Sequence, residues 1–529
     1  MVDPLLDLVS GYLRRRHGVR DHAAVATLLE SVAAGHCRAD LDPARLGGAI
    51  GTVLAADAAG VALGRHARAE ARLARRLQAL VAVPPDDLTA ADAALIKARF
   101  PTAGTTLDLQ AVAVVAALRH RLTVITGGPG TGKTTVAAAV VEALLSRQPA
   151  LTVLLATPTG KAAARLRESL AGARLPPEVR AQLARRTATL HRHLGVRPDG
   201  SGVRHDADHP LPCDLLILDE VSMIDVERLA DAFDALAPGA RVVLLGDRHQ
   251  LASVEAGYAL GDIAAAAGTG GVVSPAFAAA CQVIGVVPPS SGTVPPLADR
   301  VVTLRVSHRF RDDRGIGRWA QAVNAGTLPS SDEPEVRRCS VAELLTAAEE
   351  HGRTLLAAQD PAAALLALTR FRLLTPVRQG RLGVEGLNRT LAERLGLSAG
   401  DPGTPILVTA NDAGTGLANG DVGVIGLHDG HRQAWFSGDD GQPRAVALTR
   451  LPPWEPAWAM TVHKSQGSEF ATVGLLLPPG GEGLLVRELL YTALTRARQQ
   501  VLLAADDATL ATCVATSAAR RTGLAALLA

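Results

Sequence analysis

The sequence predicts an α/β protein with two parallel-sheet cores, a helical N-terminal domain and a small β-barrel inserted into the second core. Three observations predict this arrangement. Apolar strand-like runs alternate with helical stretches and often end in polar residues, as in open parallel sheets. The first hundred residues show helical patterns rich in Ala and Arg and contain no chemical motif. Between about 400 and 456, short alternating runs are separated by Gly, Asp and Asn turns, which is typical of a small barrel.

We expect the chain to divide into a helical domain, a first core and a second core, over 1–104, 105–330 and 331–529. Within the first core, the segment of about 195–214 is polar and rich in turn residues, which indicates an insertion. The segment 267–300 contains GTGGVVSP and VVPPSSGTVPP, which predict a flexible connection. The runs FRLLTPVR, ATVGLLLPP and RQQVLLAAD predict the second α/β layer, which has no phosphate loop of its own.

Composition narrows the class of protein. The chain has 529 residues, enough for about three or four domains with large buried cores. A hydrophobic fraction of 48% excludes disorder, and charged residues interrupt the apolar runs, so no membrane span is expected. The N-terminus lacks the layout of a signal peptide, which predicts a cytoplasmic protein. The cysteines form no C-x-x-C pair, which argues against zinc, iron–sulfur clusters or disulfides: Cys37, Cys213, Cys281, Cys339 and Cys513.

A glycine-rich loop, GGPGTGKT, lies between the strand-like run 122–126 and the helical stretch 133–146. It matches the phosphate-loop pattern G-x-x-x-x-G-K-[ST] in the strand-to-helix context that the pattern requires. Its backbone N–H groups can surround a phosphate at the helix N-terminus, while Lys133 reaches the β- and γ-phosphates and Thr134 ligates Mg²⁺. The predicted nucleotide-binding residues of the loop are Gly127, Gly128, Pro129, Gly130, Thr131, Gly132, Lys133, Thr134 and Thr135.

Two later strand-like runs also end in polar residues with suitable chemistry. CDLLILDEVSM ends at Asp219 and Glu220, and ARVVLLGDRHQ ends at Asp247 and Gln250. Asp219 suits Mg²⁺, and Glu220 can orient and deprotonate the water that attacks the γ-phosphate. The amide of Gln250 can hydrogen-bond both that water and a γ-phosphate oxygen. Each residue alone could be an ordinary strand-end or helix-capping residue, but their order after a phosphate loop favours catalysis.

The choice of basic residues is informative although the net charge is only +2. Only four lysines occur among 54 basic residues, so each is expected where a compact ammonium is preferred to a guanidinium. A restriction-type nuclease needs a lysine two residues after a carboxylate, and none of the four fits. DNA cleavage is therefore not expected from this chain. The lysines are Lys97, Lys133, Lys161 and Lys464.

The chain resembles superfamily 1 helicases, and more closely the RecD family, the α subunit of bacterial exodeoxyribonuclease V. The resemblance covers most of the chain. It rests on segments in a fixed order: LDLQAVAVVAAL, the phosphate loop, DEVSM, GDRHQLASV, LRVSHRF, GLANGDVGVI and LLYTALTRAR. One departure is Ala252, where the family usually has proline after Gln-Leu, and it affects only the local turn.

The resemblance implies two RecA-like motor domains that enclose ATP and Mg²⁺. It places Gln110 where the adenine is read, and Arg309 and Arg496 across a cleft from Lys133, where they would stabilise charge on the transferred phosphoryl group. It also implies that the segment 195–214 is a small hairpin able to wedge between DNA strands. The predicted metal ligands are Thr134 and Asp219, and the predicted catalytic residues are Lys133, Asp219, Glu220, Gln250, Arg309 and Arg496.

Contacts to DNA are predicted from side-chain chemistry and from the resemblance. Hydroxyls, amides and a few cations suit phosphate and sugar binding without base reading, whereas an aromatic fraction of 3% argues against a stacking platform for every base. His463 could instead be an ordinary strand-end histidine, and packing is favoured over base contact for Trp454 and Trp458. The predicted DNA-binding residues are Thr157, Thr159, Lys161, Thr189, His191, Thr461, His463, Lys464 and Gln466.

The sequence therefore predicts an ATP-dependent 5′-to-3′ DNA helicase subunit of a RecBCD-type exonuclease V complex that acts in double-strand break repair and recombination. Its expected partners are single-stranded DNA, duplex ends and the RecB and RecC subunits, with the N-terminal domain as the docking region and no membrane. The polarity and the partners are carried over from the family. The alternatives are a free-standing RecD-like helicase and a nucleotide-binding scaffold without motor action.

Overall fold

The computed structural model describes most of the chain. Two of the domain boundaries expected from the sequence, at 104/105 and 330/331, and the tip of the insertion within 195–214, lie outside the described residues. The described ranges are 4–101, 107–172, 175–197, 202–268, 270–310, 314–329, 333–412, 414–428, 430–438, 441–481 and 483–529. No helix within these ranges is long and apolar enough to cross a membrane.

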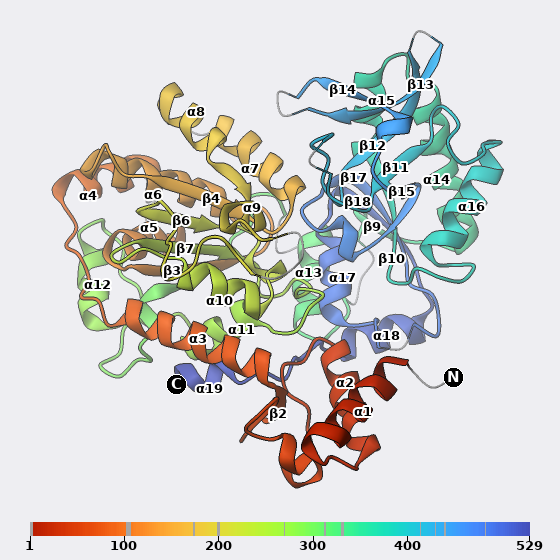
Figure 1. The fold of residues 1–529 in the computed structure, drawn as a ribbon. Helices are drawn as coiled ribbons and strands as arrows, with labels where there is room; N and C mark the ends of the chain where they lie inside the picture. The colour runs from red at the N-terminus through yellow and green to blue at the C-terminus, as the bar shows by residue number, and fades with distance from the viewer. Residues whose placement is uncertain are drawn as a thin grey trace.

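The N-terminal region is mainly helical and contains one small hairpin (Figure 1). Leu13, Leu28 and Leu46 form part of a separate apolar core within it. Two later helices instead pack on the first motor core, since Leu73 and Ile96 belong to its two buried clusters. The elements are α1 (Pro4–His17), α2 (His22–Ala33), η1 (Pro43–Ala49), β1 (Leu54–Asp57), β2 (Gly60–Leu63), α3 (Gly64–Val81) and α4 (Ala90–Arg99).

The first core is a six-stranded parallel sheet with the strand order β5-β4-β6-β7-β3-β8. Successive residues point to opposite faces of a strand, so Val124 and Leu216 join one apolar cluster while Ile125 and Ile217 join the other. Both faces are buried, which explains the continuous apolar runs of the sequence. The strands are β3 (Leu122–Gly127), β4 (Val153–Thr157), β5 (Thr187–Thr189), β6 (Leu215–Leu218), β7 (Arg241–Gly246) and β8 (Val301–Leu304).

Helices cover both faces of this sheet (Figure 1). Asp108 caps α5 by accepting hydrogen bonds from the backbone N–H groups of Gln110 and Ala111, which fixes the helix that precedes β3. The helices of the first core are α5 (Leu109–Arg119), α6 (Lys133–Arg147), α7 (Gly160–Ala171), α8 (Pro177–Arg185), α9 (Leu190–Leu194), η2 (Val221–Met223), α10 (Val226–Asp234), α11 (Ala259–Ala266), α12 (Pro275–Gln282) and η3 (Ala298–Arg300).

The prediction of a flexible connection over 267–300 is wrong for its central part. Helix α12 forms there, capped by Ser274, whose hydroxyl accepts a hydrogen bond from the backbone N–H of Phe277. Phe277 and Cys281 are buried in the cluster that also holds α5 and α6. The Gly- and Pro-rich flanks concealed the helix in the sequence, but its short apolar face supplies enough burial to order it.

The second core is a five-stranded parallel sheet with the order β16-β10-β17-β18-β9. Its strands are β9 (Val336–Arg338), β10 (Phe371–Thr375), β16 (Ala459–Thr461), β17 (Phe470–Leu476) and β18 (Ala497–Ala504). Its helices are α13 (Gly315–Asn324), α14 (Val341–Leu356), α15 (Pro361–Arg370), α16 (Val384–Leu395), η5 (His463–Ser465), α17 (Arg487–Leu494) and α18 (Asp507–Ala515). This layout confirms the predicted pair of parallel-sheet cores.

A small antiparallel sheet is inserted between α16 and β16, where the sequence predicts a β-barrel. The strand order is β14-β13-β12-β11-β15, and Ile406, Ile425 and Phe436 form its own core. Trp458, just after the sheet, is 7% exposed and packs with the second core, as the packing alternative expects. The elements are β11 (Pro405–Val408), β12 (Val422–His428), β13 (His431–Ser437), β14 (Pro443–Ala447), η4 (Leu448–Arg450) and β15 (Trp454–Pro456).

The C-terminus returns to the first core. Helix α19 (Leu524–Leu528) contacts α11 and α3, and Figure 1 shows the C-terminus beside α3. The guanidinium of Arg520 donates hydrogen bonds to Glu255 O and Gly257 O over 2.6 and 2.8 Å, and Gly523 N donates to Glu70 Oε1 over 2.9 Å. The last residues therefore tie the second core to the first core and to α3.

Candidate active site

The phosphate loop connects β3 to α6 and is shaped by two glycines in left-handed conformations. Gly130 has φ +76° and Gly132 has φ +88°. A Cβ atom at Gly132 would lie 2.2 Å from Gln110 Nε2, and one at Gly130 would lie 2.5 Å from the Cβ of Arg309. The backbone conformation therefore favours glycine at both positions, and the close approach of Arg309 adds a second reason at Gly130.

Lys133 begins α6 and folds over the loop. Its Nζ donates hydrogen bonds to Gly127 O over 2.6 Å and to Gly128 O over 3.1 Å. The hydroxyl of Thr131 donates to the same Gly128 carbonyl over 2.8 Å, which braces the turn. Thr134 and Thr135 follow in the first turn of α6, half-buried and exposed respectively. The ammonium and the N-terminal N–H groups of α6 thus lie at one end of the helix, an arrangement that favours phosphate.

Asp219 and Glu220 follow β6 at the carboxyl edge of the sheet. Asp219 Oδ1 accepts a hydrogen bond from Glu220 N over 2.8 Å. Burial, reinforced by the charge of Glu220 and opposed by that of Lys133, raises the pKa of Asp219 to about 6. Glu220 has φ +54° and ψ +41°, the only positive φ of a non-glycine residue within the described ranges. Such a conformation costs roughly 1–3 kcal/mol and is characteristic of functional sites.

The segment after β7 connects the two cores. Asp247 Oδ2 accepts hydrogen bonds from Gln250 Nε2 over 3.1 Å and from the hydroxyl of Tyr491, on α17, over 2.9 Å. Gln250 is 3% exposed, and its Oε1 has no hydrogen-bond partner among the described residues. No local pattern in the sequence points to Tyr491, because the partner of a tyrosine on a helix of another core is visible only in three dimensions.

Further bonds join the same segment to the second core. Leu251 N donates to Thr492 Oγ1 over 2.9 Å, and Gln466 Nε2 donates to Leu251 O over 2.9 Å. The sequence predicts Gln466 as a DNA contact, and in the structure this residue is 7% exposed and hydrogen-bonded to the first core. The segment near η5 is therefore hydrogen-bonded directly to the residue next to Gln250.

Gln110 lies at the edge of the phosphate loop. Its Nε2 donates to Thr131 O over 2.8 Å and lies 3.1 Å from His308 Nε2. When that ring nitrogen is unprotonated, both amide hydrogens are engaged and Oε1 remains as the acceptor. An acceptor at this position suits the amino group of adenine. The sequence singled out Gln110 but not His308, which lies within the quoted segment LRVSHRF.

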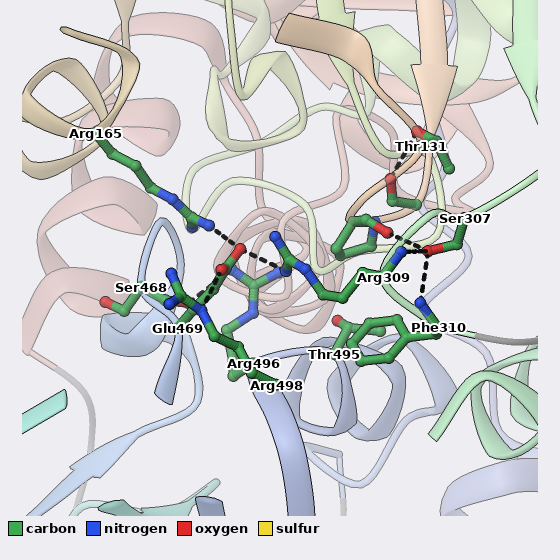
Figure 2. A network of polar contacts seen from close by, with 12 residues as sticks. Thr131, Arg165, Ser307, Arg309, Phe310, Ser468, Glu469, Thr495, Arg496 and Arg498 are labelled. Atoms are coloured by element: carbon green, nitrogen blue, oxygen red, sulfur yellow. Dashed lines mark hydrogen bonds and ion pairs between the residues drawn. The ribbon is translucent and has the colours of Figure 1, made fainter. Parts of the chain in front are cut away.

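The two predicted arginines lie in a buried polar network at the boundary of the cores (Figure 2). Arg309, on the segment after β8, donates from Nη1 to Glu469 Oε1 over 2.6 Å. Arg496 is 2% exposed and donates from Nε to Thr492 O over 3.1 Å and from Nη1 to Ser468 O over 3.4 Å. Burial lowers the pKa of Arg309 to about 10, helped by the charges of neighbouring arginines. The sequence missed Glu469, although it stands within the quoted segment MTVHKSQGSEF.

The DNA-side predictions on the first core fall at two strand ends. Thr157 is fully buried and its hydroxyl donates to Thr159 O over 2.9 Å, while the Thr159 side chain caps α7. Lys161 follows on α7, and burial lowers its pKa to about 8. Thr189 caps α9, and His191 is exposed on the same helix. Thr159 and Thr189 therefore cap helices, and the buried Thr157 hydrogen-bonds to the backbone of the loop that follows β4.

The DNA-side predictions on the second core lie around η5. The hydroxyl of Thr461 accepts a hydrogen bond from Lys464 N over 3.2 Å, and Lys464 Nζ pairs with Glu455 over 3.3 Å. Burial lowers the pKa of His463. A Cβ added at Gly467 would lie 3.7 Å from the Ala162 side chain, so η5 and the start of α7 are neighbours across the cores. The structure thus brings the Lys161 and Gln466 segments together.

The described residues of the insertion over 195–214 form no β-strand, whereas the resemblance implies a small hairpin there. Arg197 N donates a hydrogen bond to Gly202 O over 3.0 Å. Residues 198–201 themselves lie outside the described ranges.

Comparisons with known proteins support the same arrangement. Residues 110–256 match the family described as AAA domain, and residues 456–504 match the family described as UvrD-like helicase C-terminal domain. The chain is 38% identical to RecBCD enzyme subunit RecD of Mycobacterium tuberculosis over 458 residues, covering 80% of this chain and 73% of that protein.

Two other relatives extend the comparison. The RecBCD enzyme subunit RecD of Haemophilus influenzae is 33% identical over 482 residues, covering 81% of this chain and 73% of that protein. The ATP-dependent RecD2 DNA helicase of Deinococcus radiodurans is 32% identical over 468 residues, covering 85% of this chain but 56% of that protein. With the nucleotide loop, the two parallel-sheet cores and these relatives together, the chain belongs to the RecD family of superfamily 1 DNA helicases.

Proposed function

We propose that this chain is the ATP-dependent 5′-to-3′ DNA helicase subunit of a RecBCD-type exonuclease V complex that acts in double-strand break repair and recombination. The observation that carries the proposal is the junction of the two cores. There a Cβ atom at Gly128 of the phosphate loop would lie 2.9 Å from the hydroxyl of Tyr491 on the second core, and the charge of Glu220 acts on Arg496. A motor needs both halves, because closure of the two cores on ATP is what moves one DNA-gripping surface relative to the other.

The residues present fit ATP with Mg²⁺. Asp219 offers a half-buried carboxylate next to the loop, and Thr134 offers a hydroxyl on the first turn of α6, both oxygen donors of the kind that Mg²⁺ prefers. When bound, the ion would neutralise charge on the phosphates. Glu220 would take the proton of the attacking water, and the free Oε1 of Gln250 would accept a hydrogen bond from that water.

Movement would follow from the bonds between the cores. Tyr491 and Gln466 of the second core bond to the segment 247–251, which also carries Gln250. A change at the γ-phosphate sensed by Gln250 therefore reaches η5, where the predicted DNA contacts of the second core lie. This path supports a translocase over a nucleotide-binding scaffold, since a scaffold has no need to link the two surfaces.

The function is tested on DNA of defined ends. We expect single-stranded DNA to raise the ATPase rate severalfold, and we expect unwinding of a partial duplex only when the single-stranded tail is at the 5′ end. Separate substrates with 5′ tails, 3′ tails and blunt ends, each with a labelled strand, measure the polarity. A requirement for a 3′ tail would reject the assigned polarity, and an ATPase rate indifferent to DNA would favour the scaffold.

We propose that the N-terminal region docks on RecB or RecC. Helix α1 supports this, because Leu8 and Tyr12 lie four residues apart on one face and are 66% and 46% exposed, while Leu13 is buried against the N-terminal core. Exposed apolar side chains that share a helix face mark an interaction surface. The free-standing RecD-like helicase stays the alternative, and the RecD2 helicase that represents it is 32% identical to this chain, against 38% for the RecD subunit of Mycobacterium tuberculosis.

Charged substitutions on α1 test the docking surface. Since α3 and α4 contribute to the first core, substitutions are cleaner than deletion of 1–104. The double variant Leu8→Glu and Tyr12→Glu should weaken co-purification with RecB and RecC by about tenfold or more, because each lost apolar contact is worth about 1–2 kcal/mol. ATPase activity should stay unchanged. The control is Leu427→Glu, because Leu427 lies on β12 and is 61% exposed. Full retention of the complex by the α1 variant would refute this docking site.

A further inference from the structure

Glu469 lies at the centre of an arginine cluster between the two cores (Figure 2). Its side chain is 5% exposed and pairs with guanidinium groups from three separate elements. Arg309, after β8, donates to Oε1 over 2.6 Å, and Arg498, on β18, donates to Oε2 over 3.0 Å. Arg165, on α7, also pairs with Oε1. One carboxylate therefore holds the first core and the second core together at this point.

The arginines of the cluster act on one another, while the charges of Glu220 and Asp219 also act on Arg165. Burial lowers the pKa of Arg309 to about 10, and the charges of Arg165, Arg498 and Arg496 act in the same direction. Burial is also the main cause that lowers the pKa of Arg165 to about 10. Arg309 bonds to Glu469, and the phosphate loop lies beside the same side chain, since the Cβ of Arg309 closely approaches Gly130. Glu469 and a γ-phosphate would therefore compete for Arg309.

Glu469 also belongs to the segment that carries predicted DNA contacts. It follows Gln466 by three residues, at the end of the stretch that runs from η5 to β17. Ser468, next to it, accepts a hydrogen bond from Arg496. A displacement of this segment by a bound DNA strand would therefore move the carboxylate that holds Arg309.

We propose that Glu469 is a positioning residue that holds Arg309 away from the γ-phosphate until a DNA strand shifts the 463–469 segment. This inference rests on the proposed helicase function and adds to it the group that links the DNA surface to the nucleotide. No covalent step is involved. The guanidinium of Arg309 can bond either to the carboxylate of Glu469 or to the γ-phosphate. Without DNA it stays bonded to Glu469, and ATP hydrolysis is therefore slow.

The charge of Glu469 is tested with Glu469→Gln, which keeps the size of the side chain. We expect the ATPase rate without DNA to rise about three- to tenfold, because charge-assisted hydrogen bonds to Arg309 are lost. The rate at saturating single-stranded DNA should change little, so the stimulation ratio falls. A fluorescent ATP analogue should bind more tightly without DNA. Glu349→Gln is the control, since Glu349 pairs with Arg353 and Arg394 on the surface of the second core.

For a second variant we expect the ATPase rate without DNA to change in the opposite direction. Arg498 is 61% exposed, so Arg498→Gln should fold, and it removes a competitor for the same carboxylate. We expect Glu469 then to hold Arg309 more firmly and the rate without DNA to fall by about twofold. A Glu469→Gln enzyme whose basal rate falls, or whose stimulation ratio and analogue affinity match the unmodified chain, would overturn the inference. Absence of DNA stimulation in the unmodified chain would instead reject the helicase proposal, while analogue binding would still report on Glu469.

Discussion

Replacement of Lys133 by Gln should abolish ATP hydrolysis. The ammonium at the start of α6 bonds to the carbonyls of Gly127 and Gly128 and is the predicted cation of the β- and γ-phosphates. Loss of one preorganised group that stabilises transition-state charge lowers turnover by about 10²–10³-fold. DNA binding without nucleotide should stay within about twofold, since Lys161 and Lys464 lie on other segments of the chain.

Single-turnover hydrolysis and fluorescence anisotropy with a labelled oligonucleotide measure these two effects. Lys97→Gln is a matched control, because Lys97 is an exposed lysine on α4 and undergoes the same chemical change. Undiminished turnover in Lys133→Gln would sink the assignment of the nucleotide site. A parallel loss of DNA binding would show that the two surfaces are not separate.

Replacement of Glu220 by Gln should leave ATP bound but hydrolysed slowly. The amide keeps the size and the hydrogen bonding of the side chain but cannot accept the proton of the attacking water, so the rate should fall by about 10²–10⁴-fold. Glu255→Gln, at an exposed position after β7, is the control for loss of a carboxylate. If nucleotide binding disappeared together with turnover, Glu220 would instead be a principal metal ligand or a structural residue.

The backbone conformation of Glu220 allows a second measurement, the melting temperature. Its φ of +54° is unfavourable for any side chain but natural for glycine. Glu220→Gly should therefore be as inactive as Glu220→Gln while melting at a higher temperature, with up to about 1 kcal/mol of strain relieved. A lower melting temperature for the glycine variant would show that the side chain, rather than strain, dominates stability at this position.

Local chemistry made much of the nucleotide site predictable from the sequence. A loop of GGPGTGKT between an apolar strand and a helix has few other uses, and carboxylates directly after apolar runs are costly unless a ligand compensates them. Asp219, Glu220 and Gln250 follow from such patterns and Gln110 from the resemblance to the family, and the structure places all four around the loop or at neighbouring strand ends. Their catalytic roles remain predictions for the experiments above.

The sequence by itself determined the fold class, the two parallel-sheet cores and the position of the inserted β-structure, because continuous apolar runs mark strands buried on both faces and short alternating runs mark the insertion. Only the tertiary structure decided which side chains meet across the cores. Glu469, Tyr491 and His308 find partners more than 150 residues away, and no local pattern encodes such pairs. The strain at Glu220 and the helix α12 also depend on surrounding packing, since the energy that holds them comes from contacts distant in the chain.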